Sequence, residues 1–295
     1  MIKKIIKIYQ KILYYSGFTE FLKIINKNKT RILMYHSIEG PNFLPKNLVV
    51  SKKKFEKQLI YLKKNYNIIS YKQFIAGKTG VLLTFDDGFM DNYRNAYPIL
   101  KKHNVPAMFF LLGKTDTINW LHKLYYLYKK KGTDIINNFN ALTNNNFKAL
   151  YECVDYLKYK TTYQNKIITK LGDVDINNLY LTQKEIKNMS NLIEFGYHTK
   201  NHTVAKLTPE IELKSNYNSF AYPFGEEKSY NKNTIKILKK YYKCAFCTTE
   251  GFYSKNKFKI ERISITNINI PEFASIVEGS NFFINNLYKK LRFQR

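Results

Sequence analysis

The chain has few of the features that mark secreted or membrane-spanning proteins. Its 295 residues include 3 cysteines, so no even set of disulfides can form. This favours a reducing compartment and structural thiols, although Cys244 and Cys247 have the spacing of a redox or zinc-binding pair. No uncharged apolar run is long enough to cross a bilayer, and no convincing secretion signal is present. We therefore expect a cytoplasmic protein, with the inner face of the membrane as the alternative location.

Acidic residues are also scarce, because 22 Asp and Glu stand against 49 Lys and Arg and leave a formal net charge of +27. Such a charge could bind the phosphates of a nucleic acid. The lysines, however, are spread through every segment and form no arginine-rich stripe. We therefore predict no nucleic-acid partner, and a basic face toward an anionic membrane or an acidic glycan stays open.

Residues 1–30 have the pattern of a basic amphipathic helix, in which apolar residues are interleaved with Lys3, Lys4, Lys7 and Lys11. Such a helix either lies on a membrane surface, as a peripheral contact, or packs on the outside of the following domain. Residues 31–295 have the length and the strand–helix alternation of one α/β domain.

Residues 113–181 interrupt this alternation and predict a helical insertion with a polar loop at 137–146. The insertion either forms a wall of the site or only decorates the domain. Trp120, at its start, has the helical spacing of a core residue more than that of a sugar-stacking one. Three further helical patterns follow residues that we predict to be N-caps, namely Ser51, Asp91 and Thr182. A final helix is predicted over 270–291.

Two adjacent carboxylates follow a predicted buried strand. The apolar run 81–83 leads into Thr-Phe-Asp-Asp-Gly, which contains Asp86 and Asp87. In parallel α/β folds the carboxyl ends of strands carry ligands, so chemistry is expected here. Consecutive side chains of a strand point to opposite sides, so one carboxylate can bind a metal while the other acts as a base. The same residues are also common in ordinary turns.

A second strand-like segment, residues 192–197, runs into His198 and His202. One carboxylate with two imidazoles supplies three ligands to a divalent ion and leaves positions for water and substrate, as in catalytic zinc sites. Zinc is the ion we expect, and cobalt or nickel would satisfy the same ligands. Two histidines and a carboxylate also suit Fe(II), which leaves a non-haem iron enzyme as an alternative.

A third segment, residues 219–225, reads Ser-Phe-Ala-Tyr-Pro-Phe-Gly and completes a pattern. Thr-Phe-Asp-Asp-Gly, His-Thr-x-x-His and Phe-Ala-Tyr-Pro-Phe-Gly, in this order, resemble the polysaccharide deacetylase family, also called the NodB homology domain or carbohydrate esterase family 4. The resemblance spans roughly residues 31–266 and implies an α/β fold, a distorted (β/α) barrel, and metal-dependent removal of acetyl groups from a sugar or glycan. It also implies Asp86 as general base and Asp87, His198 and His202 as metal ligands.

The first predicted strand ends in Leu-Met-Tyr-His and contains our candidate for the catalytic acid, His36. A subgroup of the family has such a strand, and its histidine is thought to replace a C-terminal acid. No histidine follows His202, His103 belongs to a helix and His122 to the insertion, so apart from the two proposed ligands only His36 ends a predicted barrel strand.

The third motif departs from the family at Ala221, where many members have an arginine that pairs with the base. Arg262, on a later predicted strand, could fill that space. The family arrangement also implies a backbone N–H near Phe224 as a donor to the oxyanion. A further alternative is a non-catalytic glycan-binding or membrane-associated protein that kept the fold.

Overall fold

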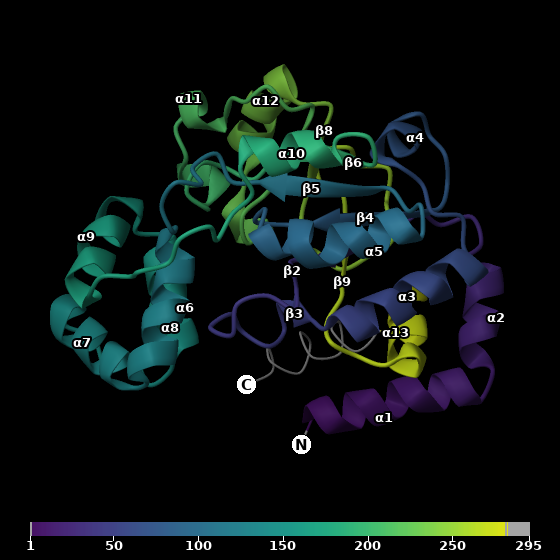
Figure 1. Ribbon diagram of the computed structural model, residues 1–295, viewed down its shortest axis with the longest axis horizontal. Coiled ribbons are helices and arrows are strands. Elements are labelled where there is room, and N and C mark those ends of the chain that lie inside the picture. Colours follow the sequence, from purple (N-terminus) through teal and green to yellow (C-terminus); the bar gives the residue numbers. More distant parts are fainter. Residues whose placement is uncertain (1, 281, 283–295) are drawn as a thin grey trace.

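The structure is a computed structural model, and it describes residues 2–280 and 282. Its centre is a parallel sheet of seven strands in the order β8-β7-β6-β5-β4-β1-β9 (Figure 1). These strands are β1 (Arg31–Tyr35), β4 (Val81–Phe85), β5 (Ala107–Leu111), β6 (Ile193–Tyr197), β7 (Ser219–Ala221), β8 (Cys244–Phe246) and β9 (Ile263–Ser264). A small parallel pair, β2 (Ser37–Ile38) and β3 (Val49–Val50), comes directly after β1.

The segment before β9 joins the two edges of the sheet. The N–H of Ile260 donates to the carbonyl of Ala245 at 3.0 Å, and the N–H of Cys247 donates to the carbonyl of Ile260 at 2.9 Å. Directly afterwards Ile263 pairs with Leu33 of β1. The sheet therefore curls into a distorted (β/α) barrel, and the predicted fold class is confirmed.

Side chains of the strands alternate between the helices outside and the barrel interior. Leu33 and Leu83 pack outward in the cluster that holds the helices, whereas Ile32 and Leu82 belong to a second cluster inside the barrel. The surrounding helices are α3 (Lys52–Asn65), α4 (Tyr71–Ile75), α5 (Tyr97–Lys102), α10 (Gln183–Met189), α11 (Glu210–Leu213), α12 (Lys232–Tyr241) and α13 (Ile270–Val277). Ser51 caps α3, and Thr182 caps α10 through a capping box, as predicted.

Asp91 does not cap the helix that follows it. Its carboxylate accepts hydrogen bonds from the N–H of Ile38 at 2.7 Å and from the hydroxyl of Ser37 at 3.0 Å. Residues 92–96 then form a π-helical turn that leads into α5. The cap prediction is wrong because two buried donors next to β1 take the carboxylate. Burial raises the pKa of Asp91 to about 7.

The insertion is a lobe of four helices to one side of the barrel (Figure 1). They are α6 (Trp120–Lys131), α7 (Asp134–Thr143), α8 (Leu150–Lys158) and α9 (Thr161–Leu171). The predicted loop at 137–146 is mostly helix, because Ile136 and Phe139 of α7 are buried in the lobe's own core. Trp120 is buried in that core as well, with 3% of its surface exposed.

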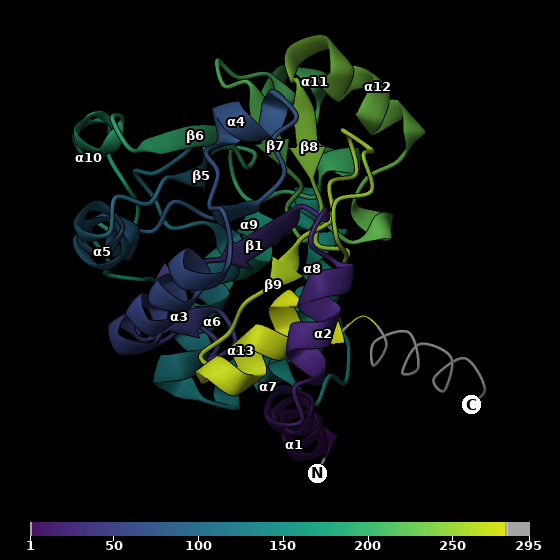
Figure 2. The same cartoon turned by 90° about the vertical axis from the view of Figure 1, so that its right-hand side faces the viewer.

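The N-terminal segment forms two helices, α1 (Ile2–Tyr15) and α2 (Phe18–Ile25), where one was predicted. Gly17 separates them with a φ of 78°, a left-handed conformation that favours glycine. Both lie beside α13 (Figures 1 and 2). Across the described residues, none of the helices combines the length and apolarity that a membrane span needs. Residues 281 and 283–291 of the predicted final helix lie outside the described residues.

Candidate metal and catalytic site

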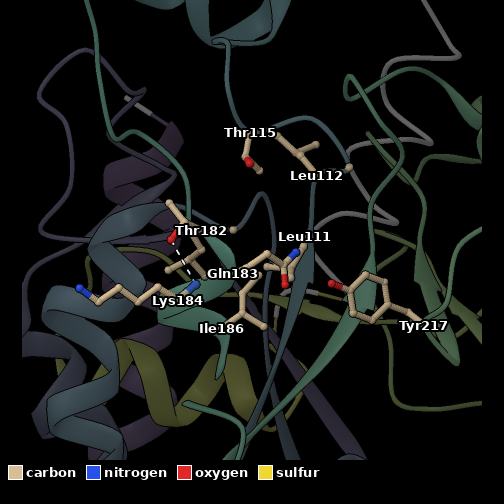
Figure 3. Close-up of a pocket in the computed structure, with 11 residues that line it drawn as sticks. Leu111, Leu112, Thr115, Thr182, Gln183, Lys184, Ile186 and Tyr217 are labelled. Atoms are coloured by element: carbon tan, nitrogen blue, oxygen red, sulfur yellow. Dashed lines mark hydrogen bonds between the residues drawn. The ribbon is translucent and has the colours of Figure 1, made fainter. Parts of the chain in front are cut away.

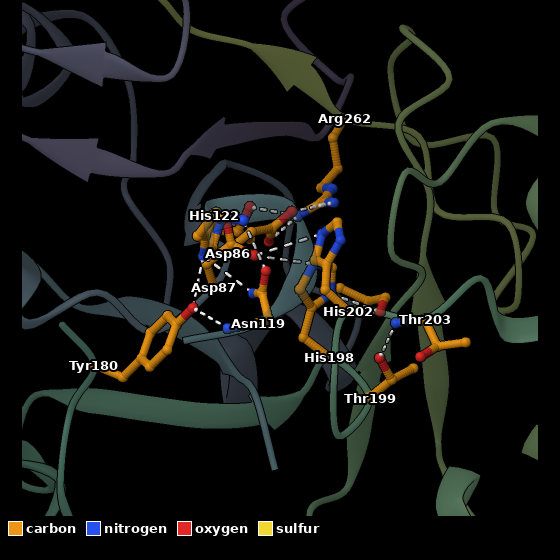
Figure 4. Close-up of polar contacts among 12 residues, drawn as sticks. Asp86, Asp87, Asn119, His122, Tyr180, His198, Thr199, His202, Thr203 and Arg262 are labelled. Atoms are coloured by element: carbon orange, nitrogen blue, oxygen red, sulfur yellow. Dashed lines mark hydrogen bonds and ion pairs between the residues drawn. The ribbon is translucent and has the colours of Figure 1, made fainter. Parts of the chain in front are cut away.

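The first two sequence motifs meet at the carboxyl ends of the strands (Figure 4). Asp86 and Asp87 directly follow β4, His198 directly follows β6, and His202 comes from the loop after it. All four side chains are buried. Parallel pairing of β4, β5 and β6 brings these ends together, because the strand ends share one edge of the barrel.

Asp87, His198 and His202 have the geometry of three ligands of one ion. Their ligand atoms all lie within 4.8 Å of one another. The Oδ1 atom of Asp87 is 3.6 Å from Nε2 of His198 and 3.5 Å from Nε2 of His202, too far for hydrogen bonds. Ligand atoms about 2.1 Å from a tetrahedral zinc ion lie about 3.4 Å apart. Oδ1 of Asp87 is buried and has no hydrogen-bond partner among the described residues, so the donor set fits a divalent ion.

The carbonyl of Ala221 orients His198. It accepts a hydrogen bond from Nδ1 of that histidine at 2.8 Å, which leaves Nε2 unprotonated and free to bind an ion. The ring of His202 packs edge-on against Phe224 at 4.8 Å between ring centroids. Burial lowers the pKa of His202 to about 3, so this imidazole is neutral, as a ligand must be.

Asp86 is held by Arg262 through two parallel hydrogen bonds. Nη1 donates to Oδ1 at 2.7 Å and Nη2 donates to Oδ2 at 2.8 Å. The guanidinium is fully buried and is fixed by a further bond from Nε to the carbonyl of Cys247 at 2.9 Å. Burial by itself would raise the pKa of Asp86, but the charge and hydrogen bonds of Arg262, together with the nearby His198 and His36, hold that pKa below the usual range. Asp86 is therefore ionised and oriented.

His36 directly follows β1, next to the strand that carries Asp86. Tyr35 pairs with Phe85, and the N–H of Asp86 donates to the carbonyl of Tyr35 at 3.0 Å, so His36 and Asp86 leave adjacent strands side by side. Burial lowers the pKa of His36, and the charges of Asp86 and Asp87 partly oppose this. The side chain is only half-buried, so it can reach a substrate.

Phe224 shapes the third motif around the cluster. Its backbone has a φ of 62°, and its carbonyl accepts a hydrogen bond from the hydroxyl of Thr248 at 2.6 Å. Within the described part of the chain its own N–H has no acceptor. Asp87, Thr199 and His202 also have positive φ values, of 72°, 61° and 55°. Residues with strained backbone conformations of this kind cluster at functional sites, where the surrounding structure holds them in place.

Sequence reasoning missed His122, which the insertion brings to the cluster. Its Nε2 lies 3.5 Å from Oδ2 of Asp87, and its side chain is fully buried. Together with the other imidazoles it lowers the pKa of Asp87 below the usual range, against burial, which would raise it. The available signal was a histidine in the first turn of a helical pattern whose neighbouring positions are apolar. Asn119 is the N-cap of that helix, and His122 lies in its first turn.

Gly88, which directly follows Asp87, lines a pocket of about 540 Å³ (the pocket is drawn in Figure 3). Gly88 and Leu111 form its inner wall, and Gln183 and Lys184 of α10 form another side. It contains none of the side chains of the metal cluster. The buried titratable groups, rather than this pocket, therefore define the chemical site.

The three motifs on a barrel of this kind are the features by which the chain resembles the polysaccharide deacetylase family. Residues 75–214 match the family model described as polysaccharide deacetylase. A Bacillus subtilis relative named as a polysaccharide deacetylase is 39% identical over 104 residues, which cover 32% of this chain and 36% of that protein. The chain thus aligns with little more than a third of that relative.

A longer match links the chain to the poly-β-1,6-N-acetyl-D-glucosamine N-deacetylase of Staphylococcus aureus. The two are 25% identical over 240 residues, which cover 70% of this chain and 76% of that protein. Among solved structures, a Streptococcus pyogenes deacetylase in complex with acetate has a TM-score of 0.56 at 24% identity, covering 83% of this chain and 96% of that one. A polysaccharide deacetylase from Bacillus cereus also has a TM-score of 0.56, at 22% identity, covering 84% and 69% of the two chains. These structures support the fold.

Proposed function

We propose that this chain is a metal-dependent hydrolase that removes N-acetyl groups from the amino sugars of a polysaccharide or its precursor. One observation carries the proposal: the carboxylate of Asp86, paired with Arg262, directly precedes Asp87, whose Oδ1 faces both histidines and has no hydrogen-bond partner among the described residues. A non-haem iron enzyme would give Asp86 no role. The N-deacetylase name of the Staphylococcus aureus relative supports an N-acetylglucosamine substrate.

The residues divide the chemistry of amide hydrolysis among them. A zinc ion bound by Asp87, His198 and His202 would supply Lewis acidity toward a water molecule and the acetyl carbonyl, and cobalt or nickel could do the same. Asp86 accepts the proton of the attacking water, and Arg262 keeps that carboxylate ionised and correctly turned.

The leaving amine and the oxyanion need two further groups. The half-buried His36 donates a proton to the departing nitrogen, because a free amide anion is a very poor leaving group. The N–H of Phe224 donates to the oxygen that gains negative charge. Acetate and a free amino sugar are the products.

Acetate release tests this function directly. Oligomers of β-1,6-linked N-acetylglucosamine are incubated with the purified protein, with and without a chelator, and acetate is measured enzymatically. We expect release that the chelator abolishes and zinc restores. His198→Ala should lose bound metal and activity together, whereas His103→Ala, whose ring is bonded to Glu56 of α3, should keep both. Unchanged metal content in His198→Ala would refute the ligand assignment, and a metal-loaded protein that releases no acetate from any acetylated glycan would favour the non-catalytic alternative.

We further propose that α1 and α2 lie on an anionic bilayer surface, because their polarity is inverted. The side that meets the domain is polar: Gln10 and Thr19 are buried, and Ser275 of α13 bonds both segments. The outward side carries large exposed apolar side chains: Ile5, Ile8, Tyr9, Ile12, Tyr15, Phe18, Phe21, Ile24 and Ile25. The exposed Lys7, on the same helix, complements anionic headgroups.

Vesicle co-sedimentation tests the membrane contact. We expect the protein to bind vesicles of phosphatidylcholine with phosphatidylglycerol, less well at high salt, and hardly at all vesicles of phosphatidylcholine alone. Ile8→Asp with Ile12→Asp should abolish binding, whereas Ile60→Asp, at an exposed site on α3, should not. Undiminished vesicle binding of the double variant would overturn the proposal. A wild-type dimer that light scattering detects and that the same two substitutions dissociate would also overturn it, because the apolar side would then bind a second copy of the chain.

A further inference from the structure

We propose that His122, from the insertion, is a positioning residue that sets the orientation of the metal ligand Asp87. The inference rests on the metal centre proposed above, and it concerns a residue that belongs to none of the three motifs. Its basis is a set of hydrogen bonds between α6 and the returning end of the insertion, together with an electrostatic contact from His122 to Asp87 (Figure 4).

Asn119 determines which nitrogen of His122 carries the proton. As the N-cap of α6, its Oδ1 accepts the backbone N–H of His122 at 2.9 Å, so its NH₂ group must face the ring. That Nδ2 lies 3.0 Å from Nδ1 of His122. An NH₂ group can only donate, so Nδ1 must be the unprotonated acceptor. The hydroxyl of Tyr180, 2.7 Å from Nδ1, then donates to it too.

The ring proton of neutral His122 is therefore on Nε2, which faces Oδ2 of Asp87 at 3.5 Å. At this distance the contact is electrostatic rather than an ordinary hydrogen bond. The two oxygens of Asp87 thus face different partners, because Oδ1 faces His198 and His202. Histidine–carboxylate contacts of this kind orient metal ligands in other metalloproteins.

His122 acts through Asp87 and does not touch substrate. It is fully buried, and its ring packs against Phe89 at 4.7 Å between centroids. It also lies outside the group of three side chains whose ligand atoms are mutually within 4.8 Å. Its position outside this group separates His122 from the metal ligands, and its contact with Asp87 makes that carboxylate the group through which it acts.

The returning end of the insertion is fixed to the same turn. The N–H of Leu181 donates to the carbonyl of Gly88 at 2.9 Å, and the N–H of Met90 donates to the carbonyl of Leu179 at 2.8 Å. Tyr180, between these two bonds, is thereby held beside the residues that follow Asp87. Both partners of the His122 ring come from the insertion, so the lobe supports the metal site.

Zinc affinity of the apo protein tests the role, measured by competition with a chromophoric chelator and without any substrate. His122→Asn should weaken zinc binding about 10–100-fold, because its short amide cannot reach Asp87. His122→Gln places an NH₂ group near the position of Nε2 and should recover most of the affinity. His103→Ala, a histidine bound to Glu56 on the surface, should have no effect. Equal affinity of His122→Asn and the wild type would overturn the proposal, and so would a failure of Gln to improve on Asn.

The tautomer can be observed in the wild-type protein if a variant does not fold. Two-bond ¹H–¹⁵N spectra distinguish protonated from unprotonated ring nitrogens, and five histidines are few enough to assign. We expect His122 to have a proton on Nε2 both before and after zinc is added, while Nε2 of His198 and His202 shifts on binding. Loss of the Nε2 proton of His122 on zinc binding would make it a ligand and refute the positioning role. Neither measurement depends on deacetylation, so a failure here is distinct from a failure of the proposed activity.

Discussion

Arg262 reaches Asp86 across an intervening strand. Arg262 directly precedes β9, which pairs with β1, and β1 separates it from β4 at whose end Asp86 lies. The guanidinium nevertheless makes two hydrogen bonds to the carboxylate, at 2.7 and 2.8 Å. The third motif has Ala221 at this place, which offers the site only its backbone carbonyl. Arg262 supplies the positive charge beside Asp86 instead.

Removing Arg262 should therefore cost both stability and activity. In Arg262→Ala the buried carboxylate of Asp86 loses its cation, which should lower the free energy of unfolding by about 3–5 kcal/mol, measured by urea denaturation. The double variant Arg262→Ala with Asp86→Asn should regain part of this loss, because an amide needs no counter-charge. If Arg262→Ala left turnover and its pH profile unchanged, Arg262 would have no part in orienting the base.

Asp86→Asn separates the base from the metal site. The amide has nearly the shape of the carboxylate but cannot accept a proton, so turnover should fall about 10²–10⁴-fold. Bound zinc, measured by elemental analysis, should stay at the wild-type level because Asp87 and both histidines are unchanged. Near-normal acetate release would remove Asp86 from the base role, and a loss of zinc would place it among the ligands.

His36→Ala should distinguish substrates by their leaving groups. Cleavage of an N-acetyl sugar should slow strongly, because the amine departs only when it is protonated. An activated aryl acetate should be affected much less, because its phenolate departs without a proton. Zinc content serves as the control and should not change. Equal losses on both substrates would indicate that His36 only supports the end of β1.

Asp91 gives the protein a specific dependence of stability on pH. Its folded-state pKa, raised to about 7, lies above the unfolded value near 3.8, so between these values only the unfolded chain ionises and stability falls as pH rises. One pKa unit corresponds to about 1.4 kcal/mol, which sets an upper bound of about 4 kcal/mol. Asp91→Asn should thus match the wild type in urea denaturation at pH 4 and exceed it at pH 8. Parallel pH profiles of the two proteins would contradict the raised pKa.

The barrel and its three motifs could be predicted because their signals are local. Buried strands such as β4 are short apolar runs, and parallel pairing places their following residues at one edge. The predictions of family and fold are confirmed for this reason. Ser51 and Thr182 could be predicted as caps because a cap depends on residues within one turn of helix.

The remaining features depend on tertiary contacts that no local pattern contains. His122 belongs to the site only because Asn119 and Tyr180 turn its ring toward Asp87. Asp91 fails as a cap because donors after β1, far away in sequence, take its carboxylate. The inverted polarity of α1 likewise could not be deduced from amphipathicity, which shows that a helix has two faces but not which face meets the domain.

The closure of the barrel by β9 imposes an order on assembly during synthesis. Asp87, His198 and His202 all leave the ribosome before Arg262 does, because they precede it in the chain. At that stage Asp86 still lacks its counter-ion and β1 still lacks one neighbour. The strand that completes the ring therefore also brings the cation that pairs with Asp86.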